Sequence, residues 1–248
     1  MALGEIVQIR WATCSASNWT SGAASGVLTF TETCTAGNLL LCIQSRNDDG
    51  AAIVTPSGWT VGPTHGTSGS SASLAGAVHW KKSDGTETGV TLSWANEAQG
   101  GQVLFLEVDA TGLDLNSVHE NDDPTIVGVE AHGTGAVTLD VAGGYIVAGF
   151  VCDNASGGRY IGSYSDSFEE IGYGSKTAGH ACVQLAAKIV SSVGPHECYG
   201  TLEPAGFDQG WGCVLGFDLL DVPTKRVIRP ATIFRAQPSA IAGSGSVS

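Results

Sequence analysis

The feature that most constrains this sequence is a weak internal repeat. Each copy opens with an apolar run that follows an Ala-Gly pair, at residues 36–43 and again at residues 142–148. The offset is 106 residues at the front of the copies (36 to 142) and 111 at the back, where Asp218 corresponds to Glu107. A repeat this long is not a solenoid period. It predicts two similar antiparallel halves, either facing each other in one sandwich or standing as two small ones.

Composition favours strands throughout the chain. Gly accounts for 35 of the 248 residues, charged residues for only 14%, and Met occurs once. Val, Thr, Ser, Gly and Ala dominate, whereas the Lys, Glu and Arg residues that fill exposed helix faces are few. Such a composition is typical of many short strands joined by glycine turns. We therefore predict an all-β protein, an antiparallel β-sandwich built from two similar halves.

The repeat and the composition together divide the chain into four parts. We predict a first sandwich half over residues 1–110, a connecting loop region over 111–135, a second half over 136–222, and an extended basic C-terminal arm over 223–248. Residues 180–189 could be helical by propensity, but the alignment of the two copies makes this segment a strand. The region from 111 to 135 is rich in turn-forming and acidic residues, which is why a loop is expected there.

Charge is distributed unevenly along the chain. The net charge is −13, which argues against direct binding to nucleic acid or to an anionic membrane, because both require a basic surface. Residues 1–222 hold 7 Lys+Arg and 24 Asp+Glu, a balance of −17, and residues 223–248 hold 4 Lys+Arg and no acid, a balance of +4. The sequence thus combines an acidic body with a basic tail.

The cysteines and the N-terminal residues bear on the compartment. Most of the seven cysteines stand inside apolar runs, so we interpret them as buried free thiols, although a bridge between Cys14 and Cys34 is conceivable. The chain begins without the basic and apolar regions of a secretory leader, and no apolar run approaches membrane-spanning length. We expect synthesis in a cytoplasm and no export by secretion.

The best candidate metal ligands are two His-x-Cys pairs, His180 with Cys182 and His196 with Cys198. Together they offer four nitrogen and sulfur ligands, yet zinc sites use Cys-x-x-Cys or His-x-x-x-His spacings. A strand also places residues two apart on one face whatever their chemistry. We therefore predict no metal-binding residue.

Catalytic residues are equally hard to find. Glycoside hydrolysis needs paired carboxylates on a concave sheet face, and Glu107, Glu169, Glu170 and Asp218 are available, but their spacing selects no pair. A Gly-x-Ser-x-Gly nucleophile needs a strand-to-helix elbow, whereas the Ser/Gly clusters here lie in turns of a β pattern. We predict a non-enzymatic protein without catalytic or cofactor-binding residues, and a polysaccharide hydrolase is the least favoured alternative.

Several motifs of the first copy carry a family resemblance. They are the runs at residues 36–40, 56–60 (Pro-Ser-Gly-Trp-Thr), 76–82 and 106–108. With these motifs, residues 25–222 resemble the jelly-roll-like structural proteins of tailed bacteriophage virions, either head decoration (cement) proteins or fibres. The resemblance implies a jelly-roll-like fold and a non-enzymatic virion protein, a trimer or another symmetric homo-oligomer bound to the major capsid protein or another virion protein. The second copy departs from the pattern, because it lacks a Gly-Trp turn at Phe168.

The C-terminal arm is the candidate partner-binding segment. It lacks the glycine turn that would fold it back, and it ends in low-complexity sequence, so it suits ordering against a neighbour; the alternative is a frayed terminus. We expect charge-assisted hydrogen bonds from its basic residues and apolar anchoring by its large hydrophobic ones. The predicted contact residues are Lys225, Arg226, Arg229, Ile233, Phe234 and Arg235.

A second function remains open at this point. A carbohydrate-binding module of a tail fibre would recognise a host-surface glycan through exposed aromatic side chains that stack on sugar rings. Trp19, Tyr160 and Tyr164 are the candidates for that role.

Overall fold

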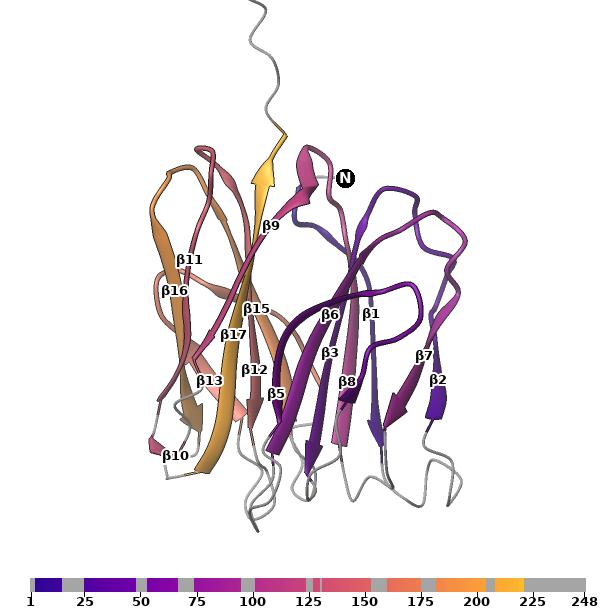
Figure 1. Ribbon diagram of the computed structural model, residues 1–248, viewed down its shortest axis with the longest axis horizontal. Coiled ribbons are helices and arrows are strands. Elements are labelled where there is room, and N and C mark those ends of the chain that lie inside the picture. The colour runs from indigo at the N-terminus through magenta and orange to yellow at the C-terminus, as the bar shows by residue number, and fades with distance from the viewer. Residues whose placement is uncertain are drawn as a thin grey trace, which may run out of the picture.

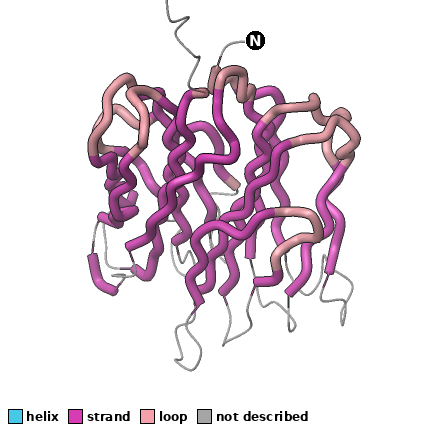
Figure 2. The backbone as a smooth tube through the Cα atoms, turned by 45° about the horizontal axis from the view of Figure 1, so that its top comes forward, coloured by secondary structure: helices cyan, strands magenta, loops and turns pink. Residues whose placement is uncertain are grey.

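A computed structural model describes most of the chain as antiparallel β-strands. The described residues are 3–14, 25–47, 53–66, 74–94, 101–123, 127–129, 131–152, 160–174, 182–203 and 208–220. Within these ranges the secondary structure is strand and turn, with no helix (Figures 1 and 2). The prediction of an all-β, antiparallel, sandwich-like fold is confirmed.

The N-terminal part of the chain forms one large and one small sheet. The large sheet has five strands in the order β1-β8-β3-β6-β5, and the small sheet has three in the order β2-β7-β4. The strand bounds are β1 Ile6–Cys14, β2 Ser25–Thr29, β3 Leu39–Asn47, β4 Ile53–Val54, β5 Thr60–Gly66, β6 Leu74–Lys82, β7 Gly89–Trp94 and β8 Gly101–Val108.

The C-terminal part forms a second pair of sheets. Its large sheet runs β10-β17-β12-β15-β14, with β9 also paired to β17, and its small sheet runs β11-β16-β13. The strand bounds are β9 Leu113–Asp123, β10 Val127–Val129, β11 Ala131–Thr138, β12 Gly144–Cys152, β13 Tyr160–Tyr164, β14 Glu169–Tyr173, β15 Cys182–Val190, β16 Pro195–Glu203 and β17 Asp208–Leu219.

The strand orders of the two parts correspond position by position. The order β1-β8-β3-β6-β5 matches β9-β17-β12-β15-β14, and β2-β7-β4 matches β11-β16-β13. The registers differ by two residues, since Glu107 pairs with Leu40, the fourth residue after Ala36, whereas Asp218 pairs with Gly144, the second residue after Ala142. Strands β3 and β12 lie at the centres of the two large sheets, which explains why the sequence repeat is clearest in their apolar runs.

Three apolar cores separate four layers of sheet. One core lies between the N-terminal small and large sheets and one between the C-terminal small and large sheets. The third core lies between the two large sheets, which face each other and pack, for example, Leu41, Ile43 and Leu104 against Val147 and Leu215. The layers follow one another across Figure 1, from β16 and β11 on one side to β7 and β2 on the other. Because both faces of β3 and β12 are covered, these strands read as continuous apolar runs.

The contacts between the large sheets are matched around a local two-fold relation. Strand β1 contacts β14 as β9 contacts β5, and β3 contacts β15 as β12 contacts β6. Glycines let the facing backbones approach. A Cβ on Gly172 would lie 2.9 Å from Ile9 Cδ1 and 3.3 Å from Leu104 Cδ2, and a Cβ on the corresponding Gly62 would lie 3.4 Å from Leu215 Cδ2. The two large sheets therefore meet through equivalent positions.

One boundary prediction is wrong. Residues 111–135 were expected to be a connecting loop region, but Leu113–Asp123 is the strand β9, which pairs with β17 from Leu219 to Gly212. The acidic and polar residues that suggested a loop lie on a strand at the sheet edge, where one face meets solvent, while Leu113 and Leu115 are buried. The prediction of a strand over residues 180–189 is confirmed for β15, since Cys182–Val190 pairs with both β12 and β14.

The departure of the second copy at Phe168 is local. Trp59 ends a turn in which its backbone N–H donates to the Pro56 carbonyl at 3.1 Å. Phe168 ends a turn at the same place in the second copy, in which its backbone N–H donates to the Ser165 carbonyl at 3.1 Å. Both aromatic rings pack against the core of their own sandwich. The second turn has positive φ at Asp166 (53°) and Ser167 (61°), which are not glycines. Each such residue costs about 1–2 kcal/mol relative to a relaxed backbone, so this turn is strained.

Candidate functional site

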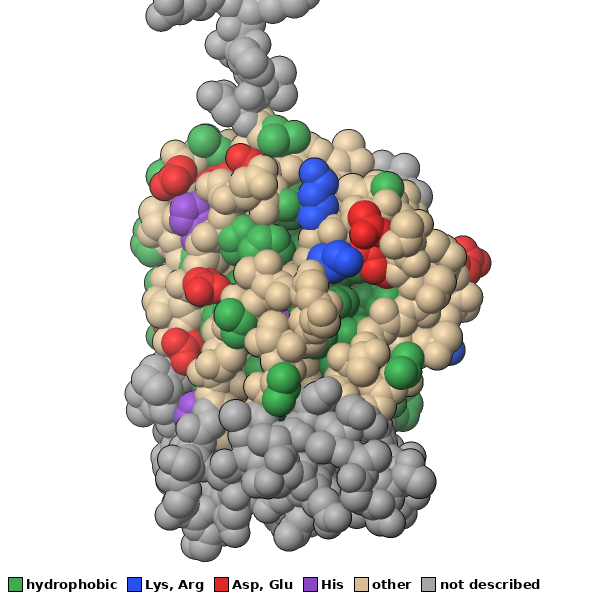
Figure 3. Space-filling view, turned by 45° about the vertical axis from the view of Figure 1, so that its right-hand side comes forward, with side chains coloured by type: hydrophobic (Ala, Val, Ile, Leu, Met, Phe, Trp, Pro, Cys, Tyr) green, Lys and Arg blue, Asp and Glu red, His purple; other side chains and the backbone are tan. Residues whose placement is uncertain are grey.

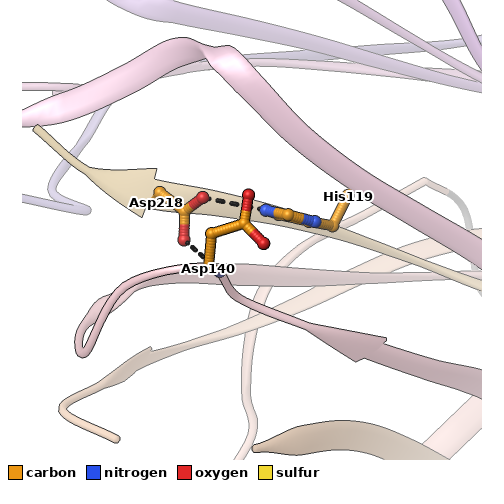
Figure 4. Close-up of side chains that lie close together, drawn as sticks. All are labelled: His119, Asp140 and Asp218. Atoms are coloured by element: carbon orange, nitrogen blue, oxygen red, sulfur yellow. Dashed lines mark hydrogen bonds and ion pairs between the residues drawn. The ribbon is translucent and has the colours of Figure 1, made fainter. Parts of the chain in front are cut away.

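The closest group of potential metal ligands lies at the end of β17. His119 on β9, Asp140 in the turn before β12, and Asp218 on β17 each bring one ligand atom within 4.8 Å of the others. His119 Nε2 lies 2.8 Å from Asp218 Oδ2, and the Asp140 carboxylate points toward the same place (Figure 4). Among the described residues this is the one such group.

Asp218 is the centre of this group and is almost fully buried. One carboxylate oxygen accepts hydrogen bonds from Ser117 Oγ at 2.6 Å and His119 Nε2 at 2.8 Å. The other accepts the backbone N–H groups of Asp140 at 3.1 Å and Val141 at 3.4 Å. Burial by itself raises the pKa of Asp218, but the hydrogen bonds from Ser117 and His119 outweigh it and hold the pKa below its ordinary value. The carboxylate therefore stays ionised and ties together three chain segments.

The first large sheet contains the same arrangement at Glu107. Its carboxylate accepts hydrogen bonds from Gln8 Nε2 on β1 at 2.6 Å, from the Thr35 backbone N–H at 2.7 Å, and from Asn38 Nδ2 at 2.7 Å. Glu107 is fully buried. In both large sheets, then, an acid near the end of the last strand fastens the first strand and the turn that leads into the central strand. We call this arrangement the acid latch.

The comparison of the two latches bears on metal binding. An imidazole nitrogen and two carboxylates are a donor set that suits a borderline divalent cation. However, both oxygens of Asp218 already accept two hydrogen bonds each, and in the first latch Gln8 and Cys34 occupy the positions of His119 and Asp140 without offering such a set. The latch thus works without metal ligands, and the arrangement at Asp218 is explained by its hydrogen bonds alone.

The residues considered as carboxylate pairs for glycoside hydrolysis do not converge. Glu107 and Asp218 are buried in separate latches. Glu169 and Glu170 lie on β14, where Glu170 accepts hydrogen bonds from Gln184 at 3.0 Å and Tyr164 at 3.4 Å. The hydrolase alternative gains no support from these positions.

Other predicted positions fall partly outside the described residues. The whole arm lies there, including Lys225, Arg226, Arg229, Ile233, Phe234 and Arg235, and so do His180 and Trp19. His196 is largely buried, and its Nε2 lies 3.3 Å from the Ser192 carbonyl. Tyr164 is half-buried, and its ring centroid lies 5.7 Å from that of Phe150. Tyr160 donates to Glu203 at 3.3 Å on the small sheet.

The cysteines of the described region do not form disulfides. Cys34, Cys42, Cys152, Cys182, Cys198 and Cys213 are all buried, which confirms the interpretation of these six as small apolar residues. A Cys14–Cys34 bridge is excluded, because Cys34 is free. Burial, followed by the nearby Glu107 carboxylate, raises the pKa of the Cys34 thiol to about 12, and burial likewise raises that of Cys198 to about 12. These thiols are protonated and unreactive at neutral pH.

A surface groove of about 560 Å³ opens beside the end of β15. Its lining includes the apolar residues Ile171, Ala187 and Ile189 and the acids Asp166 and Glu169. Ile189 is 60% exposed, the second most exposed of the large apolar side chains in the part of the chain that the structure describes. The strained turn at Asp166 and Ser167 also lines the groove.

Sequence patterns gave no sign of two polar side chains inside the first sandwich. Gln44 on β3 and His79 on β6 are fully buried, and neither side chain has a hydrogen-bond partner among the described residues. His79 stands opposite Cys42 in the strand pair. Burial lowers the pKa of His79 to about 4, so its ring is neutral at pH 7. A buried polar residue can be noticed in a sequence when it interrupts the apolar positions of an alternating strand. Strand β6 does not alternate, because its residues are apolar on both faces, so His79 was not noticed.

Comparisons with known proteins do not place the chain in a family. No protein-family model, curated protein or solved structure matches it. The described residues also contain no helix that is long and apolar enough to cross a membrane.

Proposed function

We propose that this protein is a non-enzymatic structural component of a tailed-phage virion that decorates or cements the capsid, or forms part of a head or tail fibre. In this proposal copies of the chain form a homo-oligomer, such as a trimer, and the C-terminal arm of one copy docks on a neighbouring copy or on a capsid subunit. The observation that carries the proposal is the charge division of the chain: residues 1–222 have a balance of −17 and residues 223–248 a balance of +4.

We propose further that each pair of sheets is one jelly-roll-like unit. In a jelly roll eight strands pair in nested fashion, first with eighth, second with seventh, third with sixth. The pairs β1–β8, β2–β7 and β3–β6 follow this order, as do β9–β17, β11–β16 and β12–β15 in the later part of the chain. The fifth strand of each unit departs from strict nesting, since β5 pairs with β6 and β14 with β15.

The surface of the body is compatible with permanent assembly. Acidic side chains are scattered over the face in Figure 3, and Lys and Arg are few on it. A basic segment without acids is complementary to such a body, and electrostatic complementarity of this kind selects partners and speeds their encounter. The arm leaves from Leu220, whose N–H donates to the Gly112 carbonyl at 2.7 Å, so its root is fixed to the body.

Complementation of the encoding phage tests the proposal. In a phage whose own copy of the gene is deleted, the whole chain supplied in trans should enter the particles, and a chain ending at residue 222 should remain outside them. The truncated chain should keep its β-rich circular dichroism spectrum, which shows that it folds. Equal incorporation of both chains would refute a role for the arm, and incorporation of neither would refute the virion assignment.

A further inference from the structure

The groove beside β15 has an open strand edge. Strand β14 pairs with β15 only as far as the match of Glu169 with Ala187. Beyond it, residues 188–190 pair with β12 on one side, and no described strand covers their other side. Backbone N–H and C=O groups on such an edge pair readily with an added extended segment.

The corresponding edge in the first large sheet is guarded by charge. There β5 pairs with β6 as far as the match of Thr60 with Trp80, and the next residues are Lys81 and Lys82. Lys81 is held by Glu87 at 2.7 Å and lies 3.9 Å from Asp84. Lysines on an edge strand discourage strand addition. In the second sheet the position of Lys81 is also a lysine, Lys188, but the position of Lys82 is Ile189, which is 60% exposed.

The groove also has the chemistry of a peptide site. Ile171, Ala187 and Ile189 give it an apolar lining, and the exposed Asp166 and Glu169 add carboxylates. The one lysine of the groove, Lys188, is turned to the Phe168 ring, 4.4 Å from its centroid, and donates to the Asp166 carbonyl at 3.4 Å. The groove therefore favours a cationic segment with large apolar side chains.

The C-terminal arm is such a segment, and it begins close by. It has four Lys and Arg residues and no acid. Val190 pairs with Gly144, which pairs with Asp218 near the end of β17, so the groove lies about two strand spacings, or about 10 Å, from the root of the arm. The 26 residues of the arm would span up to about 90 Å when fully extended, which is long enough to reach a copy that lies next to this end of the body.

From these observations we infer that the groove beside β15 receives the C-terminal arm of a neighbouring copy, with Phe234 against the apolar lining, Ile233 on the opposite face of the added strand, and arginines of the arm at Asp166 and Glu169. The arm then adds a short strand segment to the open edge at residues 188–190. This inference rests on the proposed assembly and names the surface that it would use.

Cysteine cross-linking between copies tests the inference. One full-length copy carries Ile189→Cys and another carries Phe234→Cys; the two are mixed, oxidised mildly and run on a non-reducing gel. A covalent dimer is expected. The matched control replaces Ile189→Cys with Val61→Cys, which lies on β5 and is 49% exposed. The control should give at least tenfold less dimer.

Two further measurements separate the possible failures. A chain that carries both Ile189→Cys and Phe234→Cys should cross-link between copies; a disulfide within one chain would show that the arm closes on its own body and would overturn the inference. The solution mass of the full-length Ile189→Lys variant should fall relative to the unmodified chain. An oligomer that persists in this variant and gives no specific cross-link would refute the groove while leaving the assembly intact, whereas a monomeric unmodified chain would refute both.

Discussion

The buried histidine of the first sandwich predicts how stability depends on pH. His79 is fully buried on β6, and neither ring nitrogen has a hydrogen-bond partner among the described residues. The informative change is His79→Leu, which removes the titrating group and keeps an apolar side chain of similar size in the core. At pH 7 the variant should be at least as stable as the unmodified protein, because an unsatisfied buried polar group costs about 1–3 kcal/mol.

The sign of the pH effect follows from the direction of the pKa shift. Burial lowers the pKa of His79 from 6.5 to about 4. The folded protein therefore binds this proton less readily than the unfolded chain. The free energy of unfolding is not reduced by this titration above pH 6.5, and it decreases as the pH falls toward 4. A shift from 6.5 to about 4 corresponds to about 3 kcal/mol across that window, taken as an upper value.

The assay is urea unfolding at a series of pH values from 7.5 to about 4. The free energy of unfolding of His79→Leu, relative to the unmodified protein, should rise by up to about 3 kcal/mol as the pH falls. His65, whose pKa is also lowered by burial, is present in both proteins, so the difference between them reports on His79. A difference that stays constant with pH would refute the reasoning and would mean that the ring is hydrated or paired in solution.

Three other substitutions test the acid latch and the packing of the large sheets. Asp218→Ala removes the acceptor of four hydrogen bonds and should destabilise the protein by about 3 kcal/mol. Asp140→Asn keeps the backbone N–H that donates to Asp218, so it should change the free energy of unfolding by less than about 0.5 kcal/mol. Thermal unfolding distinguishes the two variants, and equal effects would contradict the acid latch. Gly76→Ala should cost about 1–3 kcal/mol, because the new Cβ would lie 2.6 Å from Cε3 of the buried Trp211 between the large sheets; an unchanged melting temperature would show that these sheets do not pack as closely as described.

Much of the fold could be predicted because the repeat constrains it. The apolar runs at β3 and β12 mark the two central strands, and the alignment of the copies correctly made β15 a strand in spite of its helical propensity. Strand β9 was missed because an edge strand carries polar residues on its open face, and its acids resemble those of a turn. Local pattern alone does not separate these two cases.

The site was less predictable than the fold. Glu107 and Asp218 were noticed as equivalent acids, but their role depends on partners far away in the sequence, such as Gln8 and His119. The order of the four layers depends on which sheet faces meet. The central strands are apolar on both faces, so the periodicity of their sequence does not show which face meets which sheet. The open edge of β15 likewise becomes visible only when the length of β14 is known.

The decisive measurement for the role of the arm is the mass of the protein in solution, determined by light scattering for the whole chain and for a chain ending at residue 222. If the arm joins copies, the whole chain should be a closed oligomer and the shortened chain a folded monomer with the same β-rich spectrum. Two folded chains of the same oligomeric state would contradict the claim that the arm holds the assembly together.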